Sequence, residues 1–251
     1  MLPNLVTIGP FTLHAFGAML ALGLVGAWWF VRRDLADRGL EPDDALWLVA
    51  AAGIGGLAGA RLYYVADHWG ESGLSLISGS GLTWFGGLFG GVAAVAVAAR
   101  ARGLPMGTMA NVAGPALAIG YGVGRIGCQL AGDGDYGSAS DLPWAMSYPD
   151  GTVPTDTLVH PTPIYETASM IVLFYVLWRL RGRFDRPWAL FGVWAILAGL
   201  ERFLIEFIRL NDTVLAGLTV AQLTALGLVV VGLILVATGR RATSSGTFAP
   251  V

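Results

Sequence analysis

The sequence predicts an all-α membrane protein that crosses the bilayer seven times. Of its 251 residues, 55% are hydrophobic and only 13% are charged, and the mean hydropathy is positive, a composition typical of membrane proteins. The apolar residues are concentrated in runs of about 18 or more, the length needed to span a bilayer. A soluble protein with so many such runs would have too little polar chain to cover them, so we interpret them as membrane-spanning helices.

The first span is predicted to be a retained helix and not a removable signal peptide. No basic residues precede it, and no small-residue cleavage pattern follows it.

The seven predicted spans, in chain order, cover residues 13–31, 45–65, 82–99, 112–130, 164–180, 188–208 and 218–238.

The loops between these spans alternate in charge, which predicts their orientation. The chain has fifteen basic residues, all of them arginines, and eleven fall after the first and third spans, between the fifth and sixth, and after the seventh. Loops rich in basic residues stay in the cytoplasm. The N-terminus is therefore predicted to face outward and the C-terminus inward. These eleven residues are Arg32, Arg33, Arg38, Arg100, Arg102, Arg179, Arg181, Arg183, Arg186, Arg240 and Arg241.

The remaining connections are acidic, in keeping with an outward location. They contain Asp67, Glu71, Asp133, Asp135, Asp141, Asp150, Asp156 and Asp212. We predict one transmembrane domain over residues 1–241 and a short, disordered cytoplasmic tail over residues 242–251. The single cysteine excludes an intramolecular disulfide.

Four arginines lie within the apolar segments or at their ends: Arg61, Arg125, Arg202 and Arg209. A guanidinium is costly to place in a bilayer and marks a candidate functional site. At about 1.5 Å per residue, Arg61, Arg125 and Arg202 fall toward the outer leaflet. The planar fork of arginine suits a phosphate, so we expect these residues to bind the anionic head of a phospholipid.

The sixth span places a carboxylate between two of these arginines. Arg202, Glu206 and Arg209 follow the i, i+4, i+7 spacing and are predicted to share one helix face. The fifth span also begins at the outer surface, so Tyr165 and Glu166 can meet this group. One alternative remains open: the three residues could form an ion-paired scaffold, and Arg61 and Arg209 could extend to the interface.

A glycine-rich segment, GYGVGRIGCQLAGDGDYG over residues 120–137, surrounds Arg125. Its glycines allow another backbone or a ligand to approach closely. It lacks the Gly-Lys-Ser/Thr ending of a nucleotide loop. Asp133 and Asp135 lack the further oxygen ligands of a calcium loop, so no metal is predicted.

Several motifs together resemble the bacterial prolipoprotein diacylglyceryl transferases. They are IGPFTLHAFGAMLALG in the first span, TWFGGLFGG at the start of the third, GRIGCQLAGDGDYG from the end of the fourth span into the following turn, HPTPIYE at the entry to the fifth and ERFLIEFIRLND at the end of the sixth. The resemblance covers nearly the whole chain, and the motifs follow the order found in that family.

The resemblance implies a seven-helix enzyme of the bacterial cytoplasmic (inner) membrane whose site faces the outer leaflet. Such an enzyme moves the diacylglyceryl group of phosphatidylglycerol onto the thiol of the lipobox cysteine in a prolipoprotein signal peptide and releases glycerol 1-phosphate. The implied partners are phosphatidylglycerol, the signal peptide and the lipid bilayer, without nucleic acid or cofactor.

The residues that match the family motifs are expected to form the site. Arg125, Arg202 and Glu206 are the expected catalytic residues. The expected substrate-binding residues are Arg125, Arg202, Arg209, Arg61, Gly137, His160, Tyr165 and Glu166. The turn before Gly137 is one residue longer than in the commonest version of the family signature. Either Asp133 or Asp135 could therefore correspond to the acidic residue of that signature.

Three positions depart from the family pattern. Many members have tyrosine, histidine and asparagine where this chain has Phe16, Phe85 and Cys128. Phenylalanine neither transfers protons nor forms side-chain hydrogen bonds, so the base that deprotonates the thiol must be another group. Glu206, Glu201 and His160 are the candidates, and the sequence does not rank them. A second hypothesis is a non-catalytic paralogue that binds phospholipid or anions, or transports a solute.

Overall fold

The computed structural model describes residues 1–9, 11–69, 83–184 and 186–238. Within these ranges the regular secondary structure is helical apart from three short hairpins, which confirms the predicted helical class. The helices are α1 (Ala15–Asp37), α2 (Asp44–Asp67), α3 (Trp84–Ala101), α4 (Met106–Ala131), α5 (Thr162–Leu180), α6 (Ala189–Ile205) and α7 (Val220–Thr238). The predicted tail lies outside the described residues.

Each predicted span corresponds to one helix, but some ends differ. Helix α4 begins at Met106, before the predicted start, and α6 ends at Ile205, before the predicted end. Helices α1, α2 and α7 are long and apolar enough to cross a membrane. The chain is therefore a membrane protein, and the number of spans stays a prediction.

Three antiparallel hairpins were not predicted. They pair β1 (Asn4–Ile8) with β2 (Phe11–His14), β3 (Met146–Tyr148) with β4 (Thr155–Val159), and β5 (Thr213–Leu215) with β6 (Leu218–Thr219). The last pair is joined by Ala216 and Gly217, both with positive φ. This backbone matches the twist of a two-residue hairpin, and glycine adopts it without steric cost.

The chain forms two compact units, residues 27–109 and residues 1–26 with 110–251. In the first unit, α2 and α3 approach closely through glycines, Gly55 and Gly59 on α2 and Gly86 and Gly90 on α3. A Cβ on Gly90 would lie 2.8 Å from the Cα of Gly59. Small residues four apart allow this contact, which stabilises helix pairs in lipid by van der Waals packing.

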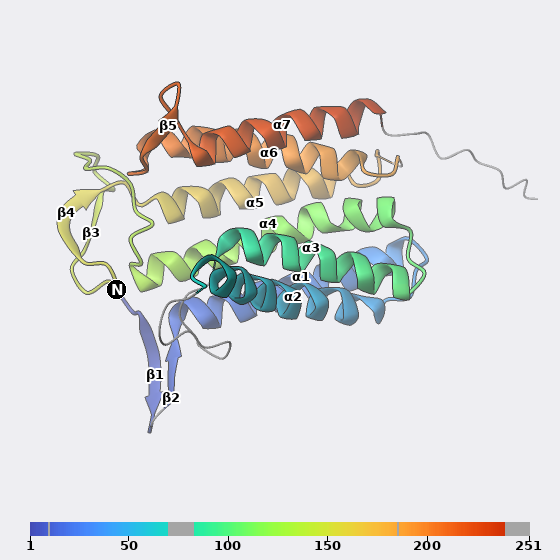
Figure 1. Ribbon diagram of the computed structural model, residues 1–251, viewed down its shortest axis with the longest axis horizontal. Helices are drawn as coiled ribbons and strands as arrows, with labels where there is room; N and C mark the ends of the chain where they lie inside the picture. The colour runs from blue at the N-terminus through green and yellow to red at the C-terminus, as the bar shows by residue number, and fades with distance from the viewer. Residues whose placement is uncertain (10, 70–82, 185, 239–251) are drawn as a thin grey trace, which may run out of the picture. The chain divides into compact units, whose positions relative to one another are not determined.

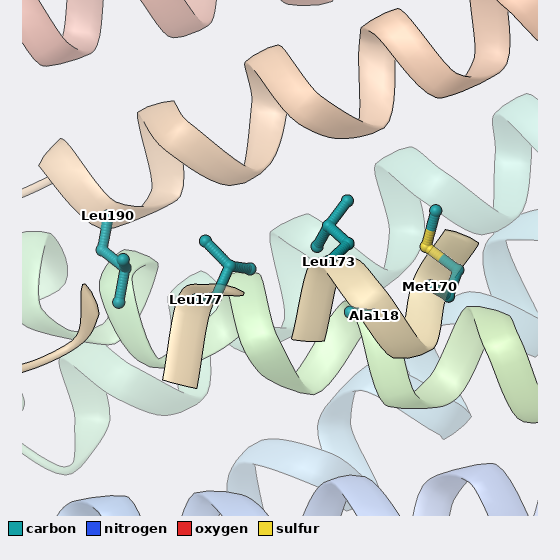
Figure 2. Close-up of a cluster of buried hydrophobic side chains, with 5 residues drawn as sticks. All are labelled: Ala118, Met170, Leu173, Leu177 and Leu190. Carbon is teal, nitrogen blue, oxygen red and sulfur yellow. The ribbon is translucent and has the colours of Figure 1, made fainter. Parts of the chain in front are cut away.

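In the second unit, α4, α5 and α6 share an apolar core (Figure 2). Ala118 comes from α4, Met170, Leu173 and Leu177 from α5, and Leu190 from α6. Leu177 and Leu190 are fully buried. Since lipid tails are as apolar as leucine, this core is stabilised mainly by close packing and less by removal from solvent.

The buried side chain of Asn111 ties α4 to the start of α6. Its Oδ1 accepts hydrogen bonds from the backbone N–H groups of Leu190 (3.0 Å) and Phe191 (3.2 Å). Its Nδ2 donates to the carbonyl of Arg186 (2.9 Å). The amide therefore satisfies backbone groups that a helix start leaves without intrahelical partners.

Helices α6 and α7 lie side by side, again through glycines (Figure 1). A Cβ on Gly232 of α7 would meet the backbone N of Ile196 at 2.9 Å, and one on Gly192 would meet the carbonyl oxygen of Gly232 at 2.8 Å. The end of α4, the start of α5 and the end of α6 lie at one end of this unit, beside the hairpins β3–β4 and β5–β6 (Figure 1). The residues predicted to bind substrate lie mainly at this end.

Candidate active site

Six charged side chains of the second unit form a single ion-paired group, which we call the charged cluster. It contains three arginines and three carboxylates, so its formal charges balance. They come from the end of α4, the loop after it, the start of α5, and the end of α6 with the residues that follow. The charged cluster consists of Arg125, Asp135, Glu166, Arg202, Glu206 and Arg209.

Arg125 is held from two sides. Its guanidinium pairs with Asp135 and with Glu166, where Nε lies 3.0 Å from Oε2. Its Nη2 donates to the hydroxyl of Tyr121 at 2.8 Å, and its Cζ lies 4.9 Å from the centre of that ring. Tyr121 precedes Arg125 by four residues and therefore lies on the same helix face. Tyr121 was not predicted from the sequence, although this spacing could have indicated it.

Glu166, in the first turns of α5, is the centre of the charged cluster and is 0% exposed. It accepts a hydrogen bond from Tyr121 (2.8 Å). Arg125, Arg202 and Arg209 all approach it, the last two at 3.5 and 3.8 Å. A buried carboxylate is tolerated only when cations and hydrogen bonds compensate it, and Glu166 has both. The predicted meeting of Glu166 with the arginines is confirmed.

Glu206 lies between two arginines, as predicted. It pairs with Arg202 at 2.7 Å and with Arg209 at 3.9 Å. Its Oε1 also accepts hydrogen bonds from Asn211 (2.7 Å) and Thr219 (2.8 Å). Neither Asn211 nor Thr219 was predicted from the sequence. The contact of Thr219 depends on the chain turning back through the hairpin β5–β6, whereas Asn211 lies before this hairpin.

The prediction that Arg202, Glu206 and Arg209 share one α-helical face was wrong. The α-helix ends at Ile205, a 3₁₀ turn follows over Glu206–Ile208, and Arg209 is extended with φ −86° and ψ 162°. A 3₁₀ turn commonly tightens the end of a helix. The change of direction lets Arg209 reach Asp135 on the loop after α4.

Asp135 bridges Arg125 and Arg209 with its two carboxylate oxygens. Burial raises the pKa of this carboxyl group, but the two guanidiniums outweigh burial, and the net effect lowers its pKa. Of the two rival acidic residues, Asp135 is the one that belongs to the charged cluster. Asp133 lies outside it, and burial raises the pKa of Asp133.

Cys128, Asp133 and Asp135 present possible metal ligands within 4.8 Å of one another. Both oxygens of Asp135 are already paired with arginines. Nearby guanidiniums disfavour a metal cation by charge repulsion. The absence of a metal stays a prediction, and this geometry is consistent with it.

Gly137 has a packing reason to be glycine. Its N–H donates to the carbonyl of His160 (2.8 Å), and the next residue, Ser138, donates to the carbonyl of Ile208 (2.8 Å). A Cβ on Gly137 would lie 2.9 Å from Cγ2 of Thr162 and would also collide with the Ile208 carbonyl. The glycine therefore lets three segments of the site converge. A role in substrate binding stays a prediction.

His160 and Tyr165 form a separate aromatic group with Trp144. The indole Nε1 of Trp144 donates to the hydroxyl of Tyr165 at 2.7 Å, and Nδ1 of His160 lies 3.4 Å from the same oxygen. Among the described residues, the side-chain hydrogen bonds of His160 and Tyr165 remain within this group. The predicted meeting of Tyr165 with the arginines is therefore not seen as a direct contact.

Arg61 belongs to the first unit, on α2. It is buried, and its Cζ lies 5.2 Å from the centre of the Tyr64 ring. This contact is of cation–π type. Its predicted role in binding a lipid headgroup stays a prediction.

The three departures from the family pattern differ in their surroundings. Phe16 and Phe85 are both exposed, and Cys128 is buried. The sulfur of Cys128 lies 3.9 Å from Nη1 of Arg125, where it can only act as a weak acceptor. Cys128 therefore lies against a charged-cluster residue, at the position where many family members have asparagine.

The comparisons with known proteins agree with this geometry. A family model described as prolipoprotein diacylglyceryl transferase matches residues 3–238. The chain belongs to the prolipoprotein diacylglyceryl transferase family.

Similar proteins include three named phosphatidylglycerol–prolipoprotein diacylglyceryl transferase. The one from Chromohalobacter salexigens is 33% identical and covers 95% of this chain and 92% of the relative. The one from Azotobacter vinelandii is 32% identical and covers 88% of this chain and 86% of the relative. The one from Thermosynechococcus vestitus is 31% identical and covers 90% of this chain and 88% of the relative. Within this transferase family, the charged cluster is the candidate active site.

Proposed function

We propose that this chain transfers the diacylglyceryl group of phosphatidylglycerol to the thiol of a lipobox cysteine in a prolipoprotein and releases glycerol 1-phosphate. The observation that carries the proposal is the convergence of Arg125, Arg202 and Arg209 in one partly buried cluster. Its relatives are named for phosphatidylglycerol and prolipoprotein, the two substrates of this reaction.

The reaction requires stabilisation of a leaving phosphate. The thiol sulfur attacks a glycerol carbon, a C–S bond forms, the C–O bond to phosphate breaks, and its electron pair stays on the phosphate oxygen. The leaving group changes from a phosphodiester to a phosphate monoester and gains negative charge. Guanidiniums fixed in a site of low dielectric stabilise that charge strongly, because they need little reorganisation.

Arg125 and Arg202 are suited to hold the phosphate, and Glu206 keeps Arg202 in place. Arg202 has the most exposed side chain among the arginines of the charged cluster, and its Nη1 has no hydrogen-bond partner among the described residues. Bidentate contacts from arginine fix both the charge and the orientation of a phosphate. Arg209, Arg61, Glu166, Gly137, His160 and Tyr165 complete the proposed binding residues.

The proposed location is the bacterial cytoplasmic membrane. We assign residues 1–241 to one domain with seven spans, an outward N-terminus and an inward C-terminus. The alternation of arginine-rich and acidic loops supports this orientation. The charged cluster then lies toward the outer leaflet, at the depth of the lipid headgroups.

Purified protein in detergent, supplied with phosphatidylglycerol and a synthetic lipobox peptide, tests the proposal. Mass spectrometry follows the lipidated peptide, and an enzymatic assay follows glycerol phosphate. We expect both products from the wild-type chain. Arg125→Ala should lower the transfer rate at least ~100-fold, which is the usual effect of removing one donor that stabilises charge in the transition state.

The rival hypothesis predicts a different result. A non-catalytic lipid-binding protein would yield neither product, although phosphatidylglycerol would still bind and would lose affinity in Arg125→Ala. That outcome would refute the proposed transfer activity while keeping the headgroup site.

A further inference from the structure

Glu201 lines a cavity, and one of its carboxylate oxygens is buried. It lies on α6, directly before Arg202, and lines an apolar cleft of about 650 Å³ between α5 and α6. Its Oε1 atom is buried and has no hydrogen-bond partner among the described residues. Such an oxygen is costly to bury, so a retained one indicates a ligand or a proton that reaches it.

The carboxylates of the charged cluster differ from Glu201 in their partners. Asp135 and Glu206 each pair with two arginines, and Glu166 with three. Arginines stabilise the charged form of a carboxylate and so make it a poor proton acceptor. Among the described residues, no ion pair engages Glu201.

The third candidate base is also engaged elsewhere. His160 Nδ1 lies 3.4 Å from the hydroxyl of Tyr165, in the aromatic group with Trp144. Glu201, in contrast, interacts electrostatically with Glu166, Arg202, Arg125 and Arg209 while remaining outside their ion pairs. It is therefore close to the charged cluster, and its side chain also lines the cleft.

We propose that Glu201 is the proton acceptor for the lipobox thiol. The inference rests on the proposed transfer activity. It selects one of the three candidate bases that the sequence does not rank. The thiol reaches Glu201 from the cleft, whose apolar lining of Val172, Leu173, Leu197 and Leu204 fits the apolar peptide segment that carries the cysteine. Its volume lies in the range of ordinary ligand sites.

The step balances in atoms and charge. The thiol proton moves to the carboxylate of Glu201, the sulfur electron pair forms the C–S bond, and the C–O electron pair leaves with the phosphate. Glu201 becomes neutral as the phosphate gains a second negative charge, so the net charge of the site is unchanged. The proton then passes from Glu201 to the departing glycerol phosphate or to water.

The test compares Glu201→Gln with wild-type protein at pH 7 in the peptide transfer assay. Glutamine keeps the shape and polarity of the side chain but removes the proton acceptor. We expect a loss of about 10² or more in transfer rate, the usual contribution of a general base, with unchanged binding of phosphatidylglycerol. Asp156→Asn, which alters an exposed acid on β4, should leave the rate unchanged.

Two further readouts separate proton transfer from a structural role. A thiol ionises unaided above its pKa of about 8.5, so the deficit of Glu201→Gln should narrow at higher pH. A peptide with selenocysteine in place of cysteine, already ionised at neutral pH, should restore the rate of the variant. Glu201→Asp, which keeps a carboxylate, should retain part of the activity even if Glu201→Gln folds poorly.

The outcomes are distinguishable. A Glu201→Gln rate within threefold of wild type, or a deficit that neither high pH nor selenocysteine reduces, would overturn the assignment of Glu201 while the transfer activity stands. A wild-type protein that produces no lipidated peptide would instead refute the proposed function, and the role of Glu201 with it.

Discussion

Among the carboxylates of the charged cluster, Asp135 is the one that we expect a phosphate to displace. Its side chain is 31% exposed, whereas those of Glu166 and Glu206 are fully buried. It lies on a loop that contains Gly132 and Gly134, both with positive φ. Because the three arginines are already balanced by three carboxylates, an incoming phosphate must compete with one of them.

Asp135→Asn should therefore bind phosphatidylglycerol more tightly. Removing the competing charge should raise the affinity for phosphatidylglycerol about fivefold, which corresponds to ~1 kcal/mol of binding free energy. This value is the upper end of the range for a partly exposed ion pair. Titration of detergent-solubilised protein with the lipid measures the effect, and Asp156→Asn serves as the control. Weaker binding by Asp135→Asn would mean that Asp135 positions the arginines and does not compete with phosphate.

Asp135 should also affect stability in acid. Its folded pKa is lowered below the usual 3.8, so its contribution to stability is present above that pH and is lost as the pH falls through the folded value. Thermal unfolding curves from pH 6 to pH 3 should show a larger loss of Tm for the wild type than for Asp135→Asn. Parallel losses in the two proteins would contradict the ion-pair account of Asp135.

At the same scale, the sequence predicted the arginines and Glu206 but not all of their partners. Arg125 and Arg202 stood out because a guanidinium within an apolar run needs compensation. The choice between Asp133 and Asp135 could not be made, because it depends on how the loop folds back onto Arg209. The extended conformation of Arg209 likewise depends on this tertiary contact.

At the scale of elements, the helices were predictable and the hairpins were not. Long apolar runs identify helices with ends that shift by a few residues. The strands of the hairpins are two to five residues long, too short for periodicity to detect. Glycine contacts between helices, as at Gly192 and Gly232, depend on which faces meet, and the sequence alone does not specify them.

The contact between α6 and α7 yields a matched pair of substitutions on one helix. A side chain at Gly232 would meet Ile196, whereas nothing lies within 4 Å of a Cβ at Gly227. Gly232→Leu should destabilise the protein by about 2 kcal/mol through overpacking, and Gly227→Leu should have little effect. Thermal unfolding in detergent measures both. Equal effects would show that α6 and α7 do not pack through Gly232.

At the scale of the whole molecule, seven spans with an outward N-terminus give a direct topological prediction. Single cysteines replace Asp150 in the loop between β3 and β4, or Arg183 between α5 and α6, in a Cys128→Ala background. In intact cells, an impermeant maleimide should label the first cysteine and not the second. Labelling of both, or of the second alone, would contradict the predicted orientation.

The most direct test of the central claim is a structure of this protein with phosphatidylglycerol bound. We predict that the lipid phosphate contacts Arg125 and Arg202, and that Asp135 has moved away from at least one of its arginines. A phosphate located elsewhere, with the ion pairs of the charged cluster intact, would show that the cluster is a structural scaffold and not the headgroup site.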